Sequence, residues 1–466
     1  MQETNRYHAQ RFGISLHSSR QSINMDSWEH LSSEEFIAFL GIIIAMGILK
    51  LPTVRDYWCR KSIFCSTDIA AIMPRNRFEA ILRHLHLRNT SVMPPSNHDK
   101  LFRVRPFLEY IGLRFRKAFY PFQPLAVDEM MIAFKGRSSI KQYMPLKPIK
   151  RGFKVWALCD GDTAYLLEFI IYEGAADTKD STPLGLGGSV VCSLLQNYYN
   201  TNHVLFCDNY FTSVELFEFL LKNGVYACGT TRPTRRSFPV SSKMKSSAKL
   251  GISKPSHGEM RCTYVGNVLA IGWQDKRDVH MLTSLHDDSS IVIHRRQKDG
   301  SLKDQPVPKA VVDYNKHMGA VDIMDQRRSY YTCTRRSTRS WLRIFWWSVD
   351  TAIINSWILY NLKFAPNKLS QREFREELVY SMTTSWCTRR KHVGRKRKRN
   401  ISLEFRREGR HFPIEGMKQM DCEACKEKGR GRHQSKILCD ICLVALCVKH
   451  CFKEWHTKAG CKRLNV

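Results

Sequence analysis

The spacing of apolar positions changes several times along the 466-residue chain, and each change marks an expected domain boundary. The first 120 residues lack the alternation typical of strands and carry helix signals. Ser32 and Glu35, for example, have the spacing of a capping box ahead of the apolar run 36–49. We therefore predict a helical domain over residues 1–120.

Short strand-type runs follow between residues 121 and 233. One run ends at Asp128, and the others cover 152–160, 164–174, 203–207 and 226–231, with helix-type stretches at 190–198 and 213–223. The resulting order is strand, two more strands, helix, strand, helix, strand. That is the order of a ribonuclease H-like core, so the sequence predicts an α/β fold.

The rest of the chain divides into further segments that differ in composition and in expected secondary structure. Residues 234–310 are rich in Ser, Lys and Arg and contain short strand patterns, so we expect a β-rich insertion in the core. Residues 311–385 are helical in pattern and should complete the core. A basic linker over 386–420 and a cysteine-rich, zinc-binding domain over 421–466 should follow.

The charge of the chain points to a polyanionic partner. Lys and Arg number 74 against 43 Asp and Glu, which gives a net charge of +31 and favours nucleic acid. The run 36–49 is too short to cross a bilayer, which needs about 20 apolar residues. The longer run 341–360 carries Arg343, Asp350 and Asn355 and reads as a buried helix, so we expect no membrane span.

Two local features suggest an intracellular setting. Seven of the sixteen cysteines lie beyond residue 420, which indicates a local metal site in a reducing compartment and not a disulfide framework. The basic run 389–399 is either a solvated linker, a nuclear import signal or a phosphate contact.

Acidic residues stand at the ends of two expected strands. Asp128 ends the first strand of the core and Asp208 ends the fourth, and these strands are neighbours in a ribonuclease H-like sheet. A later helix offers Asp322 and Asp325 one turn apart. Converging carboxylates on rigid strand ends suit two Mg²⁺ ions and phosphodiester chemistry. Taken singly, each strand-end Asp could be only a turn former or helix cap, and Asp325 could simply pair with Arg328.

The tail offers eight ligands for two structural zinc ions within 35 residues, namely Cys422, Cys425, Cys439, Cys442, Cys447, His450, Cys451 and His456. Interleaved, cross-brace ligation would put Cys422, Cys425, Cys447 and His450 on one ion and Cys439, Cys442, Cys451 and His456 on the other. A RING-like ubiquitin ligase is suggested by the tail alone. The missing final C-x2-C pair and the body of about 400 residues argue against it.

Four segments resemble the piggyBac transposase family: VDEMMIAFKGRSSIKQYMPLKPIKRGFKVW (127–156), CDNYFTS (207–213), DYNKHMGAVDIMDQ (313–326) and INSWILYN (354–361). The resemblance implies a cut-and-paste DNA transposase whose catalytic aspartates are Asp128, Asp208 and Asp322, with Asp325 in an assisting role. It also implies hairpin formation at the cut ends and joining to a TTAA target. In that family the zinc tail binds the transposon ends, and its ligand pattern leaves His433 or Cys461 as alternatives to His450.

The resemblance extends to partners and location. It implies a helical domain for dimerisation and DNA binding, a homodimer that holds two double-stranded transposon ends, and a nuclear protein. The alternative is a domesticated DNA-binding protein that no longer transposes. Family members usually carry a long acidic segment before the ETNRYHAQ-like start, which stands at residue 3 here.

Basic residues flank the acids and are candidate phosphate contacts, with solvated charged faces as the alternative. The candidates are Lys135, Arg137, Lys141, Lys147 and Lys150 after the first acid, Arg327, Arg328, Arg335 and Arg336 after the third, and Lys449 and Lys453 in the tail.

Overall fold

We describe a computed structural model of the chain, which forms two units, Met1–Thr388 and Arg389–Val466. The structure describes residues 1–15, 28–59, 67–93, 99–145, 147–174, 183–243, 255–296, 300–335, 337–384, 386 and 411–457. The expected basic run 389–399 lies outside the described residues.

The N-terminal third of the larger unit is helical, as the sequence predicts. Its elements are α1 (Gln2–Ser15), α2 (Ser33–Ile48), η1 (Val54–Trp58), α3 (Thr67–Ile72), α4 (Arg75–His84) and α5 (Arg105–Ala118). Ser32 caps α2, because its side chain accepts a hydrogen bond of 3.2 Å from the backbone N–H of Glu35. The helix α11 (Gln371–Thr384) packs on α2, where a side chain at Gly41 would collide with Thr383. Both ends of this unit therefore build the helical part.

A mixed sheet of nine strands forms the centre of the larger unit, and its order is β2-β3-β1-β5-β6-β9-β8-β7, with β4 also paired to β3. The strands are β1 (Pro124–Ala133), β2 (Gln142–Tyr143), β3 (Arg151–Asp160), β4 (Leu166–Ile171), β5 (Val204–Cys207), β6 (Tyr226–Thr230), β7 (Met260–Val265), β8 (Val268–Gln274) and β9 (Asp278–Thr283). The predicted α/β fold is confirmed. The strands between 260 and 283 continue the core sheet through β6 and β9 and do not form a separate one.

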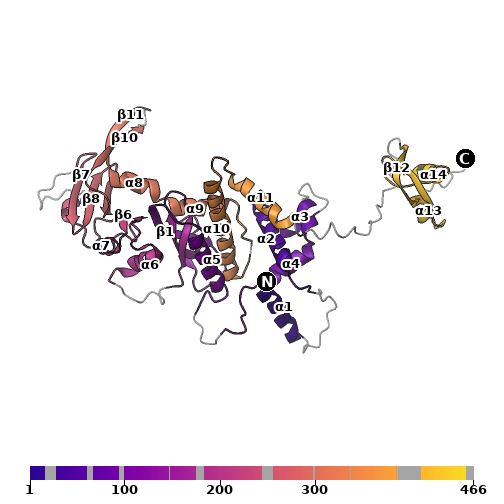
Figure 1. Cartoon of the computed structure of the whole chain (residues 1–466), viewed down its shortest axis with the longest axis horizontal. Coiled ribbons are helices and arrows are strands. Elements are labelled where there is room, and N and C mark those ends of the chain that lie inside the picture. The colour runs from indigo at the N-terminus through magenta and orange to yellow at the C-terminus, as the bar shows by residue number, and fades with distance from the viewer. Residues whose placement is uncertain are drawn as a thin grey trace. The chain divides into compact units, whose positions relative to one another are not determined.

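Helices cover the sheet and link its strands. They are α6 (Gly185–Leu195), η3 (Gln196–Tyr198), α7 (Val214–Lys222), η4 (Val240–Ser242), α8 (Lys309–His317), α9 (Ala320–Tyr330) and α10 (Ser340–Lys363). A separate hairpin of β10 (Ser290–Arg296) and β11 (Leu302–Pro308) projects from the end of the unit near β7 and β8 (Figure 1). No helix in the described part of the chain is long and apolar enough to span a membrane.

The helix α10 runs through the core of the larger unit. Trp346 and Trp347 are fully buried, and so is Asp350, which lies 3.9 Å from the guanidinium of the equally buried Arg375 on α11. The carboxylate of Asp350 also accepts hydrogen bonds from the Thr332 hydroxyl and the Cys333 N–H, at 2.7 and 2.9 Å. This network fixes the segment that leaves α9.

The smaller unit is built on one hairpin, β12 (Pro413–Asp421) and β13 (Gln434–Cys439), with two short helices, α13 (Glu423–Glu427) and α14 (Cys451–Thr457). Its small core consists mainly of cysteines together with Leu446 and Trp455. The first strand of this hairpin lies in sequence that we expected to be linker.

Candidate active site and metal centres

Two parallel neighbouring strands bring the first two acids together. β1 and β5 pair in parallel with Val127 opposite Cys207, so Asp128 and Asp208 follow next to each other. Asp208 directly follows its strand, but the prediction that Asp128 ends its strand is wrong, because β1 continues to Ala133 along its other neighbour, β3. Asp128 is 9% exposed, and one of its carboxylate oxygens accepts the N–H of Glu129 at 2.7 Å. Asp208 accepts the N–H of Tyr210 at 3.0 Å. It is not the cap of the following helix, because Ser213 caps α7.

The third acid comes from α9, which packs against β1 and β3. Asp322 stands in the first turn of this helix and acts electrostatically on Lys147, as Asp128 also does. Asp325, one turn later, pairs with the buried guanidinium of Arg328 at 2.6 Å. The alternative interpretation of Asp325 as an ion-pair partner is therefore confirmed.

The electrostatics of the site show crowded negative charge. Burial raises the pKa of Asp128 to about 7, with Lys147 opposing the rise and the carboxylates of Glu129 and Asp208 adding to it. Burial also raises the pKa of Asp208. Burial alone would lower the pKa of Lys147, but the charges of Asp128, Glu129 and Asp322 outweigh it and raise that pKa. A divalent cation is the ligand that such a carboxylate set fits best.

The aspartate site is wider than a closed metal cage. In the described ranges, sets of three or more His, Cys, Asp or Glu ligand atoms all within 4.8 Å of one another occur only in the smaller unit. Carboxylates farther apart than this limit still fit Mg²⁺, which keeps several waters and binds phosphate oxygens in place of a full set of protein ligands. The donor set therefore fits that cation.

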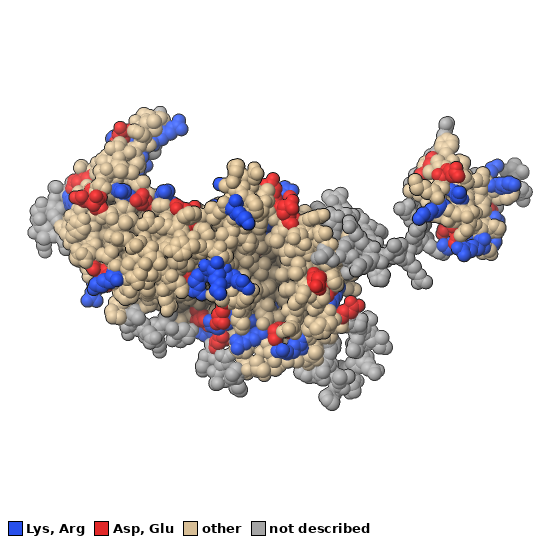
Figure 2. All heavy atoms as spheres, in the orientation of Figure 1, with Lys and Arg blue, Asp and Glu red and all other residues tan. Residues whose placement is uncertain are grey.

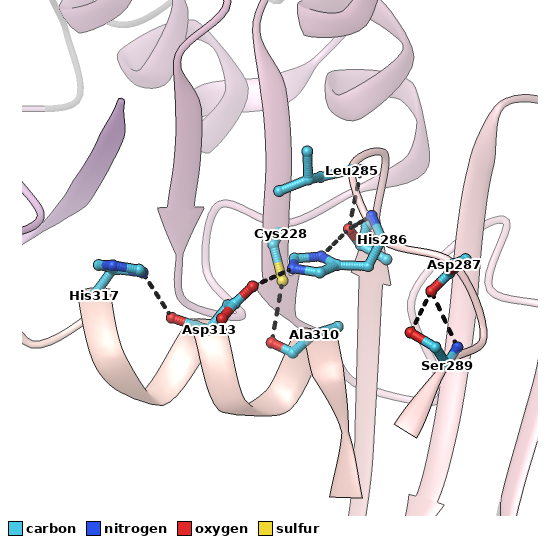
Figure 3. A network of polar contacts seen from close by, with 9 residues as sticks. Cys228, Leu285, His286, Asp287, Ser289, Ala310, Asp313 and His317 are labelled. Carbon is cyan, nitrogen blue, oxygen red and sulfur yellow. Dashed lines mark hydrogen bonds and ion pairs between the residues drawn. The ribbon is translucent and has the colours of Figure 1, made fainter. Parts of the chain in front are cut away.

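A polar network anchors α8, the helix directly before α9 (Figure 3). The His286 ring lies between the Thr283 hydroxyl and the Asp313 carboxylate, at 2.8 and 3.0 Å. The Thr283 oxygen already accepts from two backbone N–H groups, which leaves its proton for His286 Nδ1 and makes Nε2 the donor to Asp313. The Cys228 thiol donates to the Ala310 carbonyl at 3.6 Å. These contacts hold the start of α8, the helix that leads into the helix carrying Asp322.

The other end of α8 is held by His317. Its Nε2 lies 3.4 Å from Asp162, and its ring packs 5.0 Å from the ring of Phe206, two residues before Asp208. Sequence reasoning missed this helix anchor, since a His and an Asp far apart in the chain give no local signal. The only sequence clue is that Asp162 stands two residues after the end of the apolar strand β3.

The basic candidates divide into three groups. Lys147 lies in the site, 3.4 Å from a carboxylate oxygen of Glu129. Arg327 donates to the Thr163 carbonyl at 2.7 Å and Arg328 to Asp325, so both serve contacts inside the fold. The remaining described candidates are at least partly exposed, namely Lys135, Arg137, Lys141, Lys150, Arg335, Lys449 and Lys453, and Arg336 lies outside the described residues. Lys and Arg side chains also gather near the middle of the larger unit's visible face (Figure 2).

The smaller unit contains two sets of four potential zinc ligands. One consists of Cys422, Cys425, Cys447 and Cys451, and the other of His411, Cys439, Cys442 and His456. Within each set all four ligand atoms lie within 4.8 Å of one another, with Cys425 and Cys451 sulfurs 3.4 Å apart. Four sulfur and nitrogen donors at such distances fit a tetrahedral zinc ion. The order along the chain is interleaved, as expected for a cross-brace.

The membership of the two sets differs from the expected pairing. Cys451 belongs with Cys422, Cys425 and Cys447, not with His456, and His450 is exposed outside both sets. His411 is the fourth ligand of the set with Cys439, Cys442 and His456. The hairpin register sets Pro413 opposite Cys439 and so brings His411 to that cysteine. His433 is also exposed, and Cys461 lies outside the described residues. A lone His 28 residues before Cys439 gave no spacing signal.

The sequence was compared with protein-family models and with known proteins, and the matches agree on the type of protein. A family model described as Transposase IS4 matches residues 1–357. PiggyBac transposable element-derived protein 3 of Homo sapiens is 28% identical over 443 residues, which cover 92% of this chain and 71% of that protein. PiggyBac transposable element-derived protein 5 of Homo sapiens is 26% identical over 368 residues, covering 76% of this chain and 68% of that protein.

A solved structure gives the same result. The cryo-EM structure of a piggyBac transposase synaptic complex with hairpin DNA superimposes with a TM-score of 0.75 at 25% identity. The match covers 96% of this chain and 91% of that one.

Proposed function

From the premise that this chain belongs to the piggyBac transposases, within the family described as Transposase IS4, we propose that it is a cut-and-paste DNA transposase. The observation that carries the proposal is the parallel pairing of β1 and β5, which sets Asp128 beside Asp208. α9 packs on β1 and adds Asp322.

The proposed chemistry is metal-dependent cleavage and strand transfer. Asp128, Asp208 and Asp322 would hold two Mg²⁺ ions, which when bound stabilise the entering and leaving oxygens of an in-line displacement at phosphorus. The pairing of β1 with β5 would keep the carboxylates of Asp128 and Asp208 fixed while DNA enters. Water opens one strand, and the freed 3′-hydroxyl then attacks the other strand. No covalent bond to the protein forms.

The proposal extends to products and target. A solved relative is bound to hairpin DNA in a synaptic complex. We therefore propose that the second step here leaves a hairpin end and that the 3′ ends are joined at TTAA. Two ends must be brought together, so the working form is a homodimer on double-stranded DNA, and the place of action is the nucleus.

The smaller unit would serve DNA binding. Its two sets of cysteine and histidine ligands suit two structural zinc ions, and these would supply much of the stability that so small a core lacks. Lys449 and Lys453 are exposed on this unit and are proposed contacts to the transposon ends.

The test is a strand-cleavage assay on the full chain. Purified protein is incubated with Mg²⁺ and a labelled DNA duplex. The duplex carries the terminal sequences of the transposon that encodes this protein, placed beside TTAA. Nicking that disappears in Asp208→Ala but persists in Asp325→Asn supports the proposal. Nicking that survives in Asp208→Ala contradicts it.

A second candidate is a DNA-binding protein that has lost transposition. It is favoured by the names of the human relatives, which are described as transposable element-derived proteins. Tight binding of the same duplex without any cleavage in Mg²⁺ or Mn²⁺ would support this function instead.

A further inference from the structure

A cavity of about 340 Å³ lies between the helical part and the start of α10, and none of the three aspartates lines it. Its walls come from η1, α4, the segment that leads into α10, and α10 itself. Leu82, Leu342 and Trp346 supply apolar surface, and Arg83, Arg335 and Arg339 supply positive charge. One carboxylate, Glu79, also lines it and faces Arg75 of the same helix at 3.8 Å.

Among the residues that line the cavity, Arg335 has polar atoms whose role the fold does not explain. Its Nε and Nη2 atoms are buried and have no hydrogen-bond partner among the described residues. The guanidinium carbon lies 5.9 Å from the centre of the Tyr57 ring, which provides only a weak attraction. Two buried guanidinium nitrogens without an acceptor are costly, so this position is suited to an arriving anion.

The neighbouring arginines are used differently. Arg339 is satisfied, since it donates to the carbonyls of Leu82, Arg83 and Leu85 and thereby joins α4 to the start of α10. Arg343 donates to the Arg335 carbonyl, while its Nε is buried without a partner in the described ranges. Burial lowers the pKa values of Arg339 and Arg343. Positive charge at this cavity thus exceeds the nearby negative charge.

We propose that this cavity binds a backbone phosphate of duplex DNA, with the planar guanidinium of Arg335 as its two-pronged donor. The inference rests on the proposed function, because it assumes that DNA is the substrate. Guanidinium groups match phosphate oxygens in pairs, and the phosphate carries no sequence information.

The position in the chain favours DNA over a small anion. Arg335 follows α9, which carries Asp322 at its first turn and is 11 residues long. A helix of that length spans about 16 Å, which equals roughly five base pairs of duplex. A duplex cut at the aspartates could therefore place a phosphate of the same molecule in this cavity. A phosphate bound at Arg335 would fix the distance along the DNA between the cleaved bond and the helical part.

The test measures how duplex binding by the full chain depends on salt. A labelled duplex of arbitrary sequence serves as the probe, since a phosphate contact is independent of sequence. For Arg335→Gln we expect roughly tenfold weaker binding and a slope of log K against log salt that is smaller by about 0.9. Arg335→Lys should keep most of the slope. The matched control Arg55→Gln removes the same charge from an exposed neighbour and should leave the slope nearly unchanged.

Thermal melting of the free protein separates binding from folding. Because Arg335→Gln removes two buried nitrogens that have no partner in the described part of the chain, the melting temperature should be unchanged or higher. A lower melting temperature with an unchanged salt slope would mean that Arg335 only supports the fold, which overturns the proposal. Equal slope losses in Arg335→Gln and Arg55→Gln would overturn it as well.

Inorganic phosphate identifies the source of the anion. If phosphate raises the melting temperature of the wild-type protein but not of Arg335→Gln, and the DNA slope is unchanged, the cavity serves a small anion and the proposal fails. The proposed function fails separately, through cleavage that persists in Asp208→Ala.

Discussion

The ion pair between Asp350 on α10 and Arg375 on α11 offers the sharpest test of how the segment that leaves α9 is held. Both side chains are fully buried, and the three guanidinium nitrogens of Arg375 have no hydrogen-bond partner among the described residues. Asp350→Asn removes the negative charge and leaves Arg375 uncompensated, which should cost about 3–5 kcal/mol in the free energy of unfolding. In the double variant with Arg375→Met no buried charge remains, so most of that loss should be recovered.

The measurement is urea unfolding followed by tryptophan fluorescence, because α10 carries buried tryptophans close to the pair. The reasoning is refuted if Asp350→Asn costs less than about 1 kcal/mol, or if the double variant is no more stable than the single one.

The pH dependence of the same pair has a defined sign. Burial raises the pKa of Asp350 in the folded chain, against the attraction of Arg375. The folded state then holds a proton that the unfolded state releases, so stability falls as pH rises from the ordinary value of about 3.9. Arg375→Met removes the opposing charge and should steepen this fall. A destabilisation by Arg375→Met that is the same at acid and neutral pH would contradict the assignment.

The remaining predictions concern the zinc ligands and the aspartate site. His411→Ala should lower the bound zinc, measured by elemental analysis, from two ions per chain to about one, since it removes one of four ligands from one set. Asp325→Asn should reduce the free energy of unfolding by about 1–3 kcal/mol through loss of its partner for Arg328, while Asp322→Asn should abolish nicking at little cost in stability. Mn²⁺ affinity, measured by calorimetry, should rise between pH 6 and 8 because the cation must displace the proton from Asp128, whose pKa is about 7, and a flat profile would contradict this.

The parts of the fold that local patterns predict are those built from consecutive elements. Apart from the two-residue strand β2, which the patterns missed, the order of strands and helices from β1 to β6 follows from periodicity and turn residues. The capping of α2 by Ser32 follows from them as well. The adjacency of Asp128 and Asp208 follows once that order is assigned to a known type of core. These features depend on residues a few positions apart or on a single sheet topology.

Other contacts between residues far apart in the chain could not be predicted from local sequence patterns. The packing of α11 on α2 depends on the absence of a side chain at Gly41, and the continuation of the sheet through β9 depends on which strand edge is free. His411 becomes a metal ligand only through the register of β12 with β13. The buried contact of His286 with Asp313 likewise joins residues 27 positions apart, which no local rule connects.

The most direct test of the central claim is metal-directed cleavage of the protein itself. Fe²⁺ replaces Mg²⁺ at carboxylate sites, and with ascorbate and peroxide it cuts the backbone near the bound ion. Fragment masses should show cuts close to Asp128, Asp208 and Asp322 together, and excess Mg²⁺ should suppress all three. Cuts at only one of these segments, or cuts that Mg²⁺ does not suppress, would contradict a shared metal site.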